Sequence, residues 1–306
     1  MINDRHALPS DSPGDDSAES FLQHRPLLFS IAYRMLGSVA EAEDVVQDAY
    51  LRWRDRGPEP VQSAKALLTT IVTRLCLDHL KSAQHLREHY IGLWLPEPLE
   101  ASHDPANERE TESLTTAFLL LLETLSPIER AAFLLREVYD YDYRDIAAMV
   151  GKSEANCRQL VSRAREHLAR RRPRFPATTE QTEVLLRQFL QSWQQGDPQG
   201  LLATLANESI LQSDGGGKAI AAGKPVVGAA KICQFLLGVR KHGPSDVVAR
   251  FAVLNAEPAV LLFSGGQLLQ TMTFSLSSEG RIEMIYTMRN PDKLHRLATL
   301  SSVSSG

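Results

Sequence analysis

The strongest constraint on the fold lies between Asp142 and Arg172, where two helical patterns meet at a glycine. Tyr143 to Val150 has the length of a short helix, Gly151 supplies a tight turn, and the Ser153 hydroxyl is placed to cap a second helix. Apolar residues then recur at helical spacing and define one buried stripe: Cys157, Leu160, Val161, Ala164 and Leu168. The segment therefore predicts a helix-turn-helix whose second helix turns this stripe inward.

The opposite face of the second helix carries short polar groups and arginines. Such side chains suit the major groove of DNA, because arginine binds guanine through two hydrogen bonds and serine or glutamine pairs with base edges. We predict groove contacts for Ser153, Ala155, Arg158, Gln159, Ser162 and Arg163, and phosphate contacts for Lys152, Arg165, Arg170 and Arg171. The pattern alone also allows a solvated basic helix in an ordinary bundle.

Composition is that of a soluble protein with two or three domains. The 306 residues are 43% apolar and 23% charged, and no apolar run approaches the roughly 20 residues of a membrane helix. The first twenty residues are polar and acidic, which predicts a disordered N-terminus at 1–18, neither signal nor helix, and a cytoplasmic protein. The three cysteines lack metal-binding spacing, so we expect no metal, no cofactor and no disulfide.

Helices are predicted at 21–36, 41–56 and 62–88, with Gly37 joining the first two. The outer face of the second helix is largely acidic and comprises Glu41, Asp44, Gln47, Asp48 and Arg52. DNA would repel this face, so it suits a basic protein helix better, although a solvated face explains it about as well. On the third helix one face collects Arg74, Asp78, Lys81, His85 and Arg87.

Two sequence blocks resemble bacterial sigma factors of the extracytoplasmic-function (ECF) class. AEDVVQDAYLRW at 42–53 followed by LLTTIVTRLCLDHLKSA at 67–83 is similar to their regions 2.1 to 2.4, and 112–172 resembles their region 4. A WLPEP motif within YIGLWLPEPL at 90–99 marks the subgroup with a C-terminal extension. Members often have Trp where this chain has Leu67, so no role of that indole is carried over.

The WLPEP segment and the residues after it are predicted to be a tether. Pro96 and Pro98 exclude a helix, so the segment should be extended, with Trp94 as its aromatic contact and an acidic continuation at 100–111. Two further prolines in RRRPRFP at 170–176 end the second helical block. The composition changes after this point, which indicates a domain boundary.

The C-terminal part is predicted to be an α+β domain. A helix at 178–195 and a second from GDPQGLLATLA precede five β-rich runs, with one more helix near 227–240: SILQSD, VVARFAVLN, AVLLFSG, LLQTMTFSL and RIEMIYTM. This order favours helices packed on a curved antiparallel sheet. The order and the DGGGK motif at 214–218 resemble the SnoaL-like branch of the NTF2-like cone fold, and NPDKL at 290–294 is the subgroup's other motif.

The predicted fold class is thus multidomain, with all-α sigma region 2 and region 4 domains followed by an α+β SnoaL/NTF2-like cone. The expected boundaries are 19–90 for region 2, 91–111 for the linker, 112–172 for region 4 and 177–306 for the cone domain. The resemblance implies a dissociable, non-enzymatic subunit of core RNA polymerase that docks on its clamp and flap. It also implies that 153–170 recognises the −35 element in double-stranded DNA.

The resemblance assigns opening of the −10 element to the first block. A base that leaves the stack must be held in a pocket, and nearby cations bind the phosphates of the melted strand. Those cations would be Arg74, Lys81, His85 and Arg87, with Asp78 orienting a neighbouring arginine or lysine. No membrane contact is expected.

The role of the cone domain has three alternatives. Related cones include small-molecule cyclases and isomerases, so an enzyme fused to a DNA-binding module and a sigma factor gated by a small ligand in the cone both remain open. We favour intramolecular regulation, because the three glycines after Asp214 allow close backbone approach and Lys218 offers a charge to the acidic linker. The residues expected at this contact are Trp94, Leu95, Pro96, Asp214, Gly215, Gly216, Gly217, Lys218, Asn290, Pro291, Asp292 and Lys293.

Overall fold

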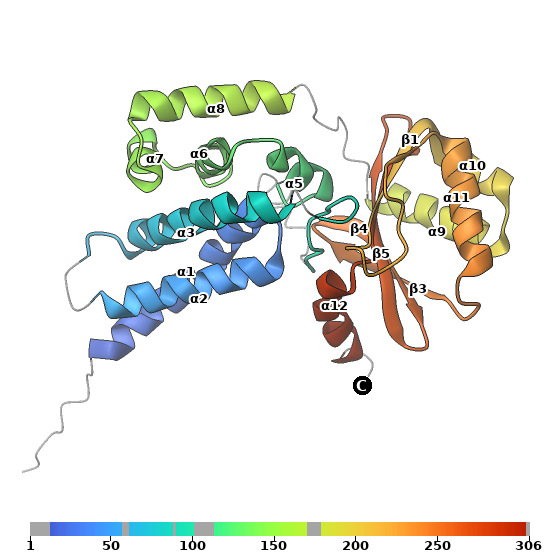
Figure 1. The fold of residues 1–306 in the computed structure, drawn as a ribbon, viewed down its shortest axis with the longest axis horizontal. Coiled ribbons are helices and arrows are strands. Elements are labelled where there is room, and N and C mark those ends of the chain that lie inside the picture. The colour runs from blue at the N-terminus through green and yellow to red at the C-terminus, as the bar shows by residue number, and fades with distance from the viewer. Residues whose placement is uncertain (1–12, 57–60, 88–89, 101–112, 170–178, 304–306) are drawn as a thin grey trace, which may run out of the picture.

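A computed structural model describes residues 13–56, 61–87, 90–100, 113–169 and 179–303. Figure 1 shows two stacked helical blocks beside a curved sheet, with helices on the far side of that sheet and α12 on the near side. Within the described ranges, no helix combines the length and apolarity needed to cross a membrane.

The first block contains α1 (Pro13–Leu36), α2 (Val39–Asp55) and α3 (Ala64–Arg87). The expectation of a non-helical N-terminus is wrong from Pro13 onward, while residues 1–12 lie outside the described ranges. Proline is tolerated at the first position of a helix, and acidic residues follow it where the helix dipole favours them. Gly37, at φ +70°, separates α1 from α2, whose N-cap is Ser38.

The second block contains α5 (Thr116–Glu123), α6 (Pro127–Glu137), α7 (Tyr143–Val150) and α8 (Glu154–Ala169). Ser126 and Glu129 cap α6 reciprocally, with proline at the first position. Gly151 closes α7 in the left-handed conformation at φ +66°. The predicted stripe of α8 is buried in full, which confirms the orientation of this helix.

The two helical blocks share one hydrophobic core. Polar contacts line the seam between them. The hydroxyl groups of Thr69 and Tyr141 lie 2.9 Å apart, and Arg130 donates a 2.6 Å hydrogen bond to the carbonyl of Met35. A seam that combines apolar and hydrogen-bonded contacts holds α1 and α3 directly against α6 and α7.

The C-terminal domain follows the predicted order of helices and strands. It comprises α9 (Thr179–Gln195), α10 (Pro198–Thr204), β1 (Leu205–Asp214), β2 (Val226–Val227), α11 (Ala229–His242), β3 (Val248–Leu254), β4 (Glu257–Ser264), β5 (Gln267–Leu276), β6 (Ile282–Met288) and α12 (Pro291–Val303). The sheet order is β2-β1-β6-β5-β4-β3. One expectation is wrong, because β1 and β6 are parallel while all other neighbours are antiparallel. Parallel and antiparallel strands show the same alternation of side chains, so the sequence could not indicate that β1 and β6 are parallel.

The two faces of the sheet have different partners. Successive side chains point to opposite faces, so Ile285 packs with α9 and α11 in one cluster while Tyr286 lies in another with Leu95 and Ala117. Figure 1 shows the corresponding layers, with α9, α10 and α11 on one side and α5 and α12 on the other. The face opposite the three helices is therefore the one that meets the linker and the helical blocks.

Candidate nucleic-acid interface and interdomain junction

The outward face of α8 carries the side chains predicted to contact the promoter, and all of those within the described residues are exposed: Lys152, Ser153, Ala155, Arg158, Gln159, Ser162, Arg163 and Arg165. The helix begins with a 3.3 Å hydrogen bond from the backbone N–H of Asn156 to the Ser153 hydroxyl. Arg170 and Arg171 lie outside the described ranges. The face thus has the solvent access that contact with another macromolecule requires.

Two of the arginines on this face are oriented by neighbours. Arg158 pairs with Glu154 at 3.0 Å and lies 4.9 Å from the centre of the Tyr143 ring. Arg165 pairs with Glu137 at 2.6 Å. Exposed ion pairs of this kind contribute little to stability, so an incoming phosphate or base can displace them at low cost.

The cations predicted for the −10 element lie in different surroundings from one another. Arg74 donates to the carbonyls of Ala148 at 2.9 Å and Met149 at 3.2 Å, where the negative end of the α7 dipole also attracts it. Its predicted role in holding DNA phosphates therefore conflicts with its position in this arrangement. Lys81 is exposed and bonded to Asp78 at 3.0 Å, as expected of that aspartate.

The other predicted residues on α3 and α2 differ in their exposure to solvent. The side chains of His85 and Arg87 lie outside the described ones, although both residues belong to α3. On α2, four members of the predicted face are exposed: Asp44, Gln47, Asp48 and Arg52. Glu41 differs, because it lies 3.3 Å from the His79 imidazole and is only partly exposed.

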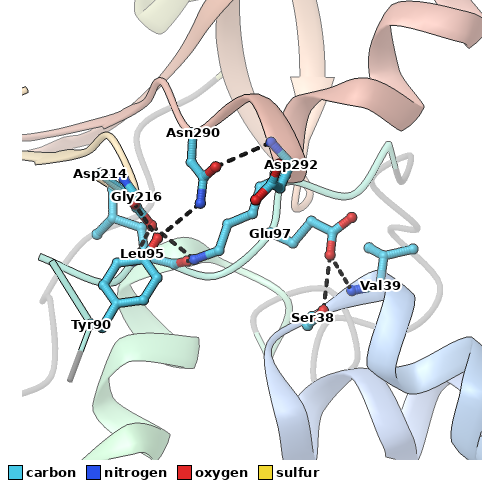
Figure 2. Close-up of polar contacts among 10 residues, drawn as sticks. Ser38, Val39, Tyr90, Leu95, Glu97, Asp214, Gly216, Asn290 and Asp292 are labelled. Carbon is cyan, nitrogen blue, oxygen red and sulfur yellow. Dashed lines mark hydrogen bonds and ion pairs between the residues drawn. The ribbon is translucent and has the colours of Figure 1, made fainter. Parts of the chain in front are cut away.

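The three short motifs meet at one buried carboxylate, that of Asp214 at the end of β1 (Figure 2). One carboxylate oxygen accepts from the Tyr90 hydroxyl at 2.6 Å and from the backbone of Gly216 at 3.0 Å. The other accepts from the backbone of Leu95 at 3.0 Å and from the Lys293 ammonium at 2.8 Å. Asp214 is fully buried, so these four donors replace its hydration.

Lys293, the cation of the NPDKL motif, neutralises Asp214 and also binds the linker. Its ammonium donates to the carbonyl of Leu95 at 2.7 Å and lies 4.4 Å from the Trp94 ring and 5.1 Å from the Tyr90 ring. Asn290 donates to the Tyr90 hydroxyl at 3.0 Å. Burial and the hydrogen bond to Asp214 raise the pKa of Tyr90, which keeps its hydroxyl protonated. We call Tyr90, Trp94, Leu95, Asp214, Asn290 and Lys293 the three-motif junction.

The glycines of the DGGGK motif are needed because the loop passes close to its neighbours. Gly216 and Gly217 have φ values of +58° and +70°, and a Cβ at Gly216 would overlap the Asn290 amide. The expected contact of Lys218 with the linker does not occur at residues 91–100, and the acidic stretch at 101–111 lies outside the described residues. Lys218 instead pairs with Asp292 at 2.5 Å, with both side chains more than half exposed, and Lys293 is the cation that reaches the linker.

Comparison with known proteins decides the family. Residues 21–86 match Sigma-70 region 2, and residues 115–168 match Sigma-70, region 4. The ECF RNA polymerase sigma factor SigJ of Mycobacterium tuberculosis is 34% identical over 291 residues, which cover 90% of this chain and 91% of that protein. The chain belongs to the ECF RNA polymerase sigma factors.

Two further comparisons extend this result to the C-terminal domain. The probable ECF RNA polymerase sigma factor SigI of Mycobacterium tuberculosis is 31% identical, over 94% of this chain and 97% of its own. The crystal structure of SigJ superimposes with a TM-score of 0.70 at 29% identity, covering 93% of this chain and 98% of that one. The predicted family and fold class, including the cone after the two sigma regions, are therefore confirmed.

The described part of the linker, residues 91–100, is packed in the interface and is not a loose tether. Leu95, Pro96 and Glu97 are buried, and the carboxylate of Glu97 accepts from the backbone of Val39 at 2.8 Å and from the Ser38 hydroxyl at 3.0 Å. A carboxylate at this position satisfies free N–H groups at the start of α2 and interacts favourably with its dipole. Figure 2 shows Glu97 directed toward this helix end. No local sequence pattern indicates this contact, because Glu97 lies 58 residues from the start of α2.

The hairpin between β3 and β4 also reaches the linker and the first sigma region. The backbone N–H of Asn255 donates to the carbonyl of Leu99 at 2.7 Å, and its side-chain oxygen accepts from the Leu99 N–H at 3.1 Å. The Asn255 amide donates to the buried Tyr33 hydroxyl of α1 at 2.5 Å. Asparagine between two β-rich runs indicates a turn, but nothing in the sequence indicates these partners.

The cone domain contacts region 4 through a second buried carboxylate. Glu257 of β4 accepts a 2.8 Å hydrogen bond from the backbone N–H of Thr116, the first residue of α5. The hydroxyl groups of Thr116 and Thr273 lie 3.2 Å apart beside it. Burial raises the pKa of Glu257 to about 7, against the lowering effect of the bonds from Thr116. On the other side, Arg296 of α12 pairs with Glu43 of α2 at 2.5 Å.

Proposed function

We propose that this ECF sigma factor recognises the −35 element through the exposed face of α8, acts on the −10 element through region 2, and is regulated by its own cone domain. The observation that carries the regulatory part is the buried carboxylate of Asp214, which joins the cone to the linker between the two sigma regions. The acidic face of α2 remains our candidate surface for core RNA polymerase, with the clamp as its partner.

Recognition by α8 follows from chemistry and access. Arg158 and Arg163 are exposed on one face with Ser162 and Gln159 between them, which presents guanidinium, hydroxyl and amide groups to one groove. Arginine and glutamine pair in a bidentate manner with guanine and adenine, respectively. The lysine and arginines at the margins of the face then neutralise phosphates, which sets affinity without setting sequence.

The compact arrangement cannot place both sigma regions on their promoter elements at once. Positions −35 and −10 are about 25 base pairs apart, roughly 85 Å at about 3.4 Å per base pair. Here α3 touches α7 through Arg74, and α7 packs on α8, so the three helices span about 30 Å at about 10 Å each. The blocks must separate before both elements are engaged.

We infer that the cone domain stabilises this closed arrangement. It binds the linker at Asp214 and Leu99, region 2 at Tyr33 and Glu43, and region 4 at Thr116. A domain that contacts both blocks and the linker favours the state in which they are together, and polymerase favours the state in which they are apart. The cone would therefore act as a built-in substitute for a separate anti-sigma protein.

Transcription from a purified system tests this proposal. Asp214→Ala, alone or combined with Lys218→Ala, and removal of 173–306 should each change promoter-dependent run-off transcription with core polymerase while residues 19–172 stay folded. For Asp214→Ala we expect an increase, because the linker loses a buried partner. Lys218→Ala alone is the matched control, since its ion pair is exposed. Unchanged transcription in the Asp214 variants and in the truncation would refute regulation by the cone.

A further inference from the structure

A small cavity lies on the helix side of the sheet, at the end of the cone nearest the three-motif junction. Its walls are apolar on the side of β1 and α11, from Leu211, Phe235 and Val239, and polar on the side of the strand ends, from Ser213, Thr287 and Arg289. The volume is about 20 Å³. Apolar walls with a few convergent polar groups have the chemistry of a small-molecule pocket, but the volume is far below the roughly 300 to 1,000 Å³ that such pockets have.

Arg289 brings a charge into this cavity that no carboxylate of the described residues balances. Its Nη1 donates to the carbonyl of Ile220 at 2.5 Å, whereas its buried Nε has no hydrogen-bond partner within the described part of the chain. The Nε atoms of Arg130 and Arg296 are also buried, but these arginines pair with Glu123 and Glu43, and Arg56 lies over the Trp53 ring. Burial lowers the pKa of the Arg289 guanidinium, which reflects the cost of this isolated charge.

Thr287 supplies a second unused donor on the same side of the sheet. Its side chain is 6% exposed, and its buried hydroxyl likewise has no partner among the described residues. Residues two apart on a strand point to the same face, so Thr287 and Arg289 both line the cavity. Buried polar groups without partners are rare in proteins, and two together indicate a missing acceptor.

We propose that this cavity is a receptor for a small organic monocarboxylate. The carboxylate accepts from Nε of Arg289 and from the Thr287 hydroxyl, and the aliphatic end lies against Leu211, Phe235 and Val239. A single cation matches a single negative charge, and apolar walls disfavour inorganic oxyanions, which need polar partners on every side. The regulatory consequence of this binding rests on the proposed function of the cone domain.

The volume of the cavity limits the size of the ligand and implies that a lining residue must move when the ligand binds. About 20 Å³ is enough for one water-sized group. A carboxylate with two to four carbons must therefore displace part of the lining. Ile220 is the candidate, since its side chain is 85% exposed and its loop is held at the cavity by the bond from Arg289.

The cavity is adjacent to the three-motif junction through neighbouring residues on two strand ends. Ser213 faces the cavity while Asp214 faces the linker, and Arg289 faces the cavity while Asn290 binds Tyr90. The two strand ends are joined by a 2.7 Å hydrogen bond from the Arg289 N–H to the Asp214 carbonyl. A ligand that shifts Arg289 would thus change the position of both residues that hold the linker.

Sodium butyrate and sodium acetate are suitable probes for the full-length protein, with butyramide and sodium chloride at equal ionic strength as controls. We expect butyrate to raise the thermal unfolding midpoint in a concentration-dependent manner and the controls to leave it unchanged. Titration calorimetry should show at least about tenfold weaker binding for Arg289→Gln and about fivefold weaker binding for Thr287→Val. Arg281→Gln, an exposed arginine of the same domain, should bind as the unaltered protein does.

The outcomes separate the receptor from its regulatory role. The proposal that the cavity binds a monocarboxylate is overturned by either of two results. One is the absence of any carboxylate-specific shift in the thermal unfolding midpoint, and the other is a shift that persists in both Arg289→Gln and Thr287→Val. If circular dichroism shows that Arg289→Gln is unfolded, the near-isosteric Thr287→Val decides alone. Binding that is lost in the variants, together with run-off transcription that does not respond to butyrate, establishes the receptor and overturns its coupling to regulation by the cone.

Discussion

The outward face of α8 and the three-motif junction both depend on basic side chains, but in opposite environments. The side chain of Arg158 on α8 is 56% exposed, with one exposed partner. Lys293 in the junction is 12% exposed and bonded to a fully buried carboxylate. The same class of residue is available to an external phosphate in one region and fully engaged within the chain in the other.

This difference predicts which measurements respond to mutation. A change on the α8 face should alter DNA binding and leave the fold intact, because water replaces the lost side chain there. A change in the junction should alter stability and the arrangement of the sigma regions, because a buried charge would lose its partner. Each prediction below tests one side of this contrast.

The largest effect is expected for Arg158→Ala combined with Arg163→Ala. Each lost bidentate base contact costs about 1 to 3 kcal/mol, so initiation that depends on the −35 element should fall at least about 30-fold. Run-off transcription measures this loss, while affinity for core polymerase and the thermal midpoint should not change. Arg187→Ala, an exposed arginine on α9, is the control and should have no effect. Reduced polymerase affinity would contradict the assignment of α8 to DNA.

The second effect is expected in the junction, where Asp214→Asn leaves the Lys293 ammonium buried without a counter-charge. Breaking a buried ion pair costs about 3 to 5 kcal/mol, which urea denaturation can measure. Asp292→Asn is the matched control, because it removes the carboxylate of an exposed pair worth less than about 1 kcal/mol. Equal losses in the two variants would show that the junction is no more important to stability than a surface pair.

The third effect concerns Glu257, which connects the cone to the start of α5. Its pKa of about 7 lies above the ordinary value of 4.5, so the folded protein holds this proton more tightly than the unfolded chain does. Stability from this group is therefore greatest below pH 4.5 and falls as the pH rises to about 7. Glu257→Gln keeps an acceptor for Thr116 but does not titrate. The fall in the free energy of unfolding with rising pH should therefore be about 2 to 3 kcal/mol smaller in the variant.

The measurement for Glu257→Gln is the free energy of unfolding at pH 5 and pH 8 in both proteins. The change in this free energy between the two pH values is then compared between the variant and the unaltered protein. In that comparison the contributions of all other titrating groups cancel, provided that the substitution leaves them unchanged. A variant whose stability falls between these two pH values as steeply as that of the unaltered chain would contradict a raised pKa at this site.

Local features of this sigma factor could be predicted from sequence, because their causes lie within a few residues. The cap at Ser126, the turn at Gly151 and the buried stripe of α8 each follow from neighbours on the same helix. The three motifs were expected to lie at an interdomain contact, and the structure brings Trp94, Asp214 and Lys293 together. Resemblance to a family marked the three motifs, and the glycines and the lysine of DGGGK gave the expectation of a contact.

The contacts missed by the sequence analysis join residues that are distant along the chain. Glu97 caps a helix that begins 58 residues earlier, and Asn255 binds Tyr33 across 222 residues. No local pattern indicates which acceptor a buried donor will meet, because satisfaction of a polar group depends on packing. The same reason explains Lys218 and Lys293, two lysines in motifs of which only the buried one meets the linker at residues 91–100.

The smallest effect distinguishes two cations on α3. While the protein is closed, as we propose for it without core polymerase, Arg74 binds carbonyls at the end of α7, so Arg74→Gln should lower stability by less than about 1 kcal/mol and leave the salt dependence of DNA binding nearly unchanged. Lys81 is exposed beside Asp78, so Lys81→Gln should reduce the slope of log affinity against log salt by about 1, as expected for one lost phosphate contact. Fluorescence anisotropy with promoter DNA over a salt series gives both slopes. If Arg74→Gln lowers the slope as much as Lys81→Gln does, Arg74 leaves α7 when DNA binds, and the closed seam opens at that residue.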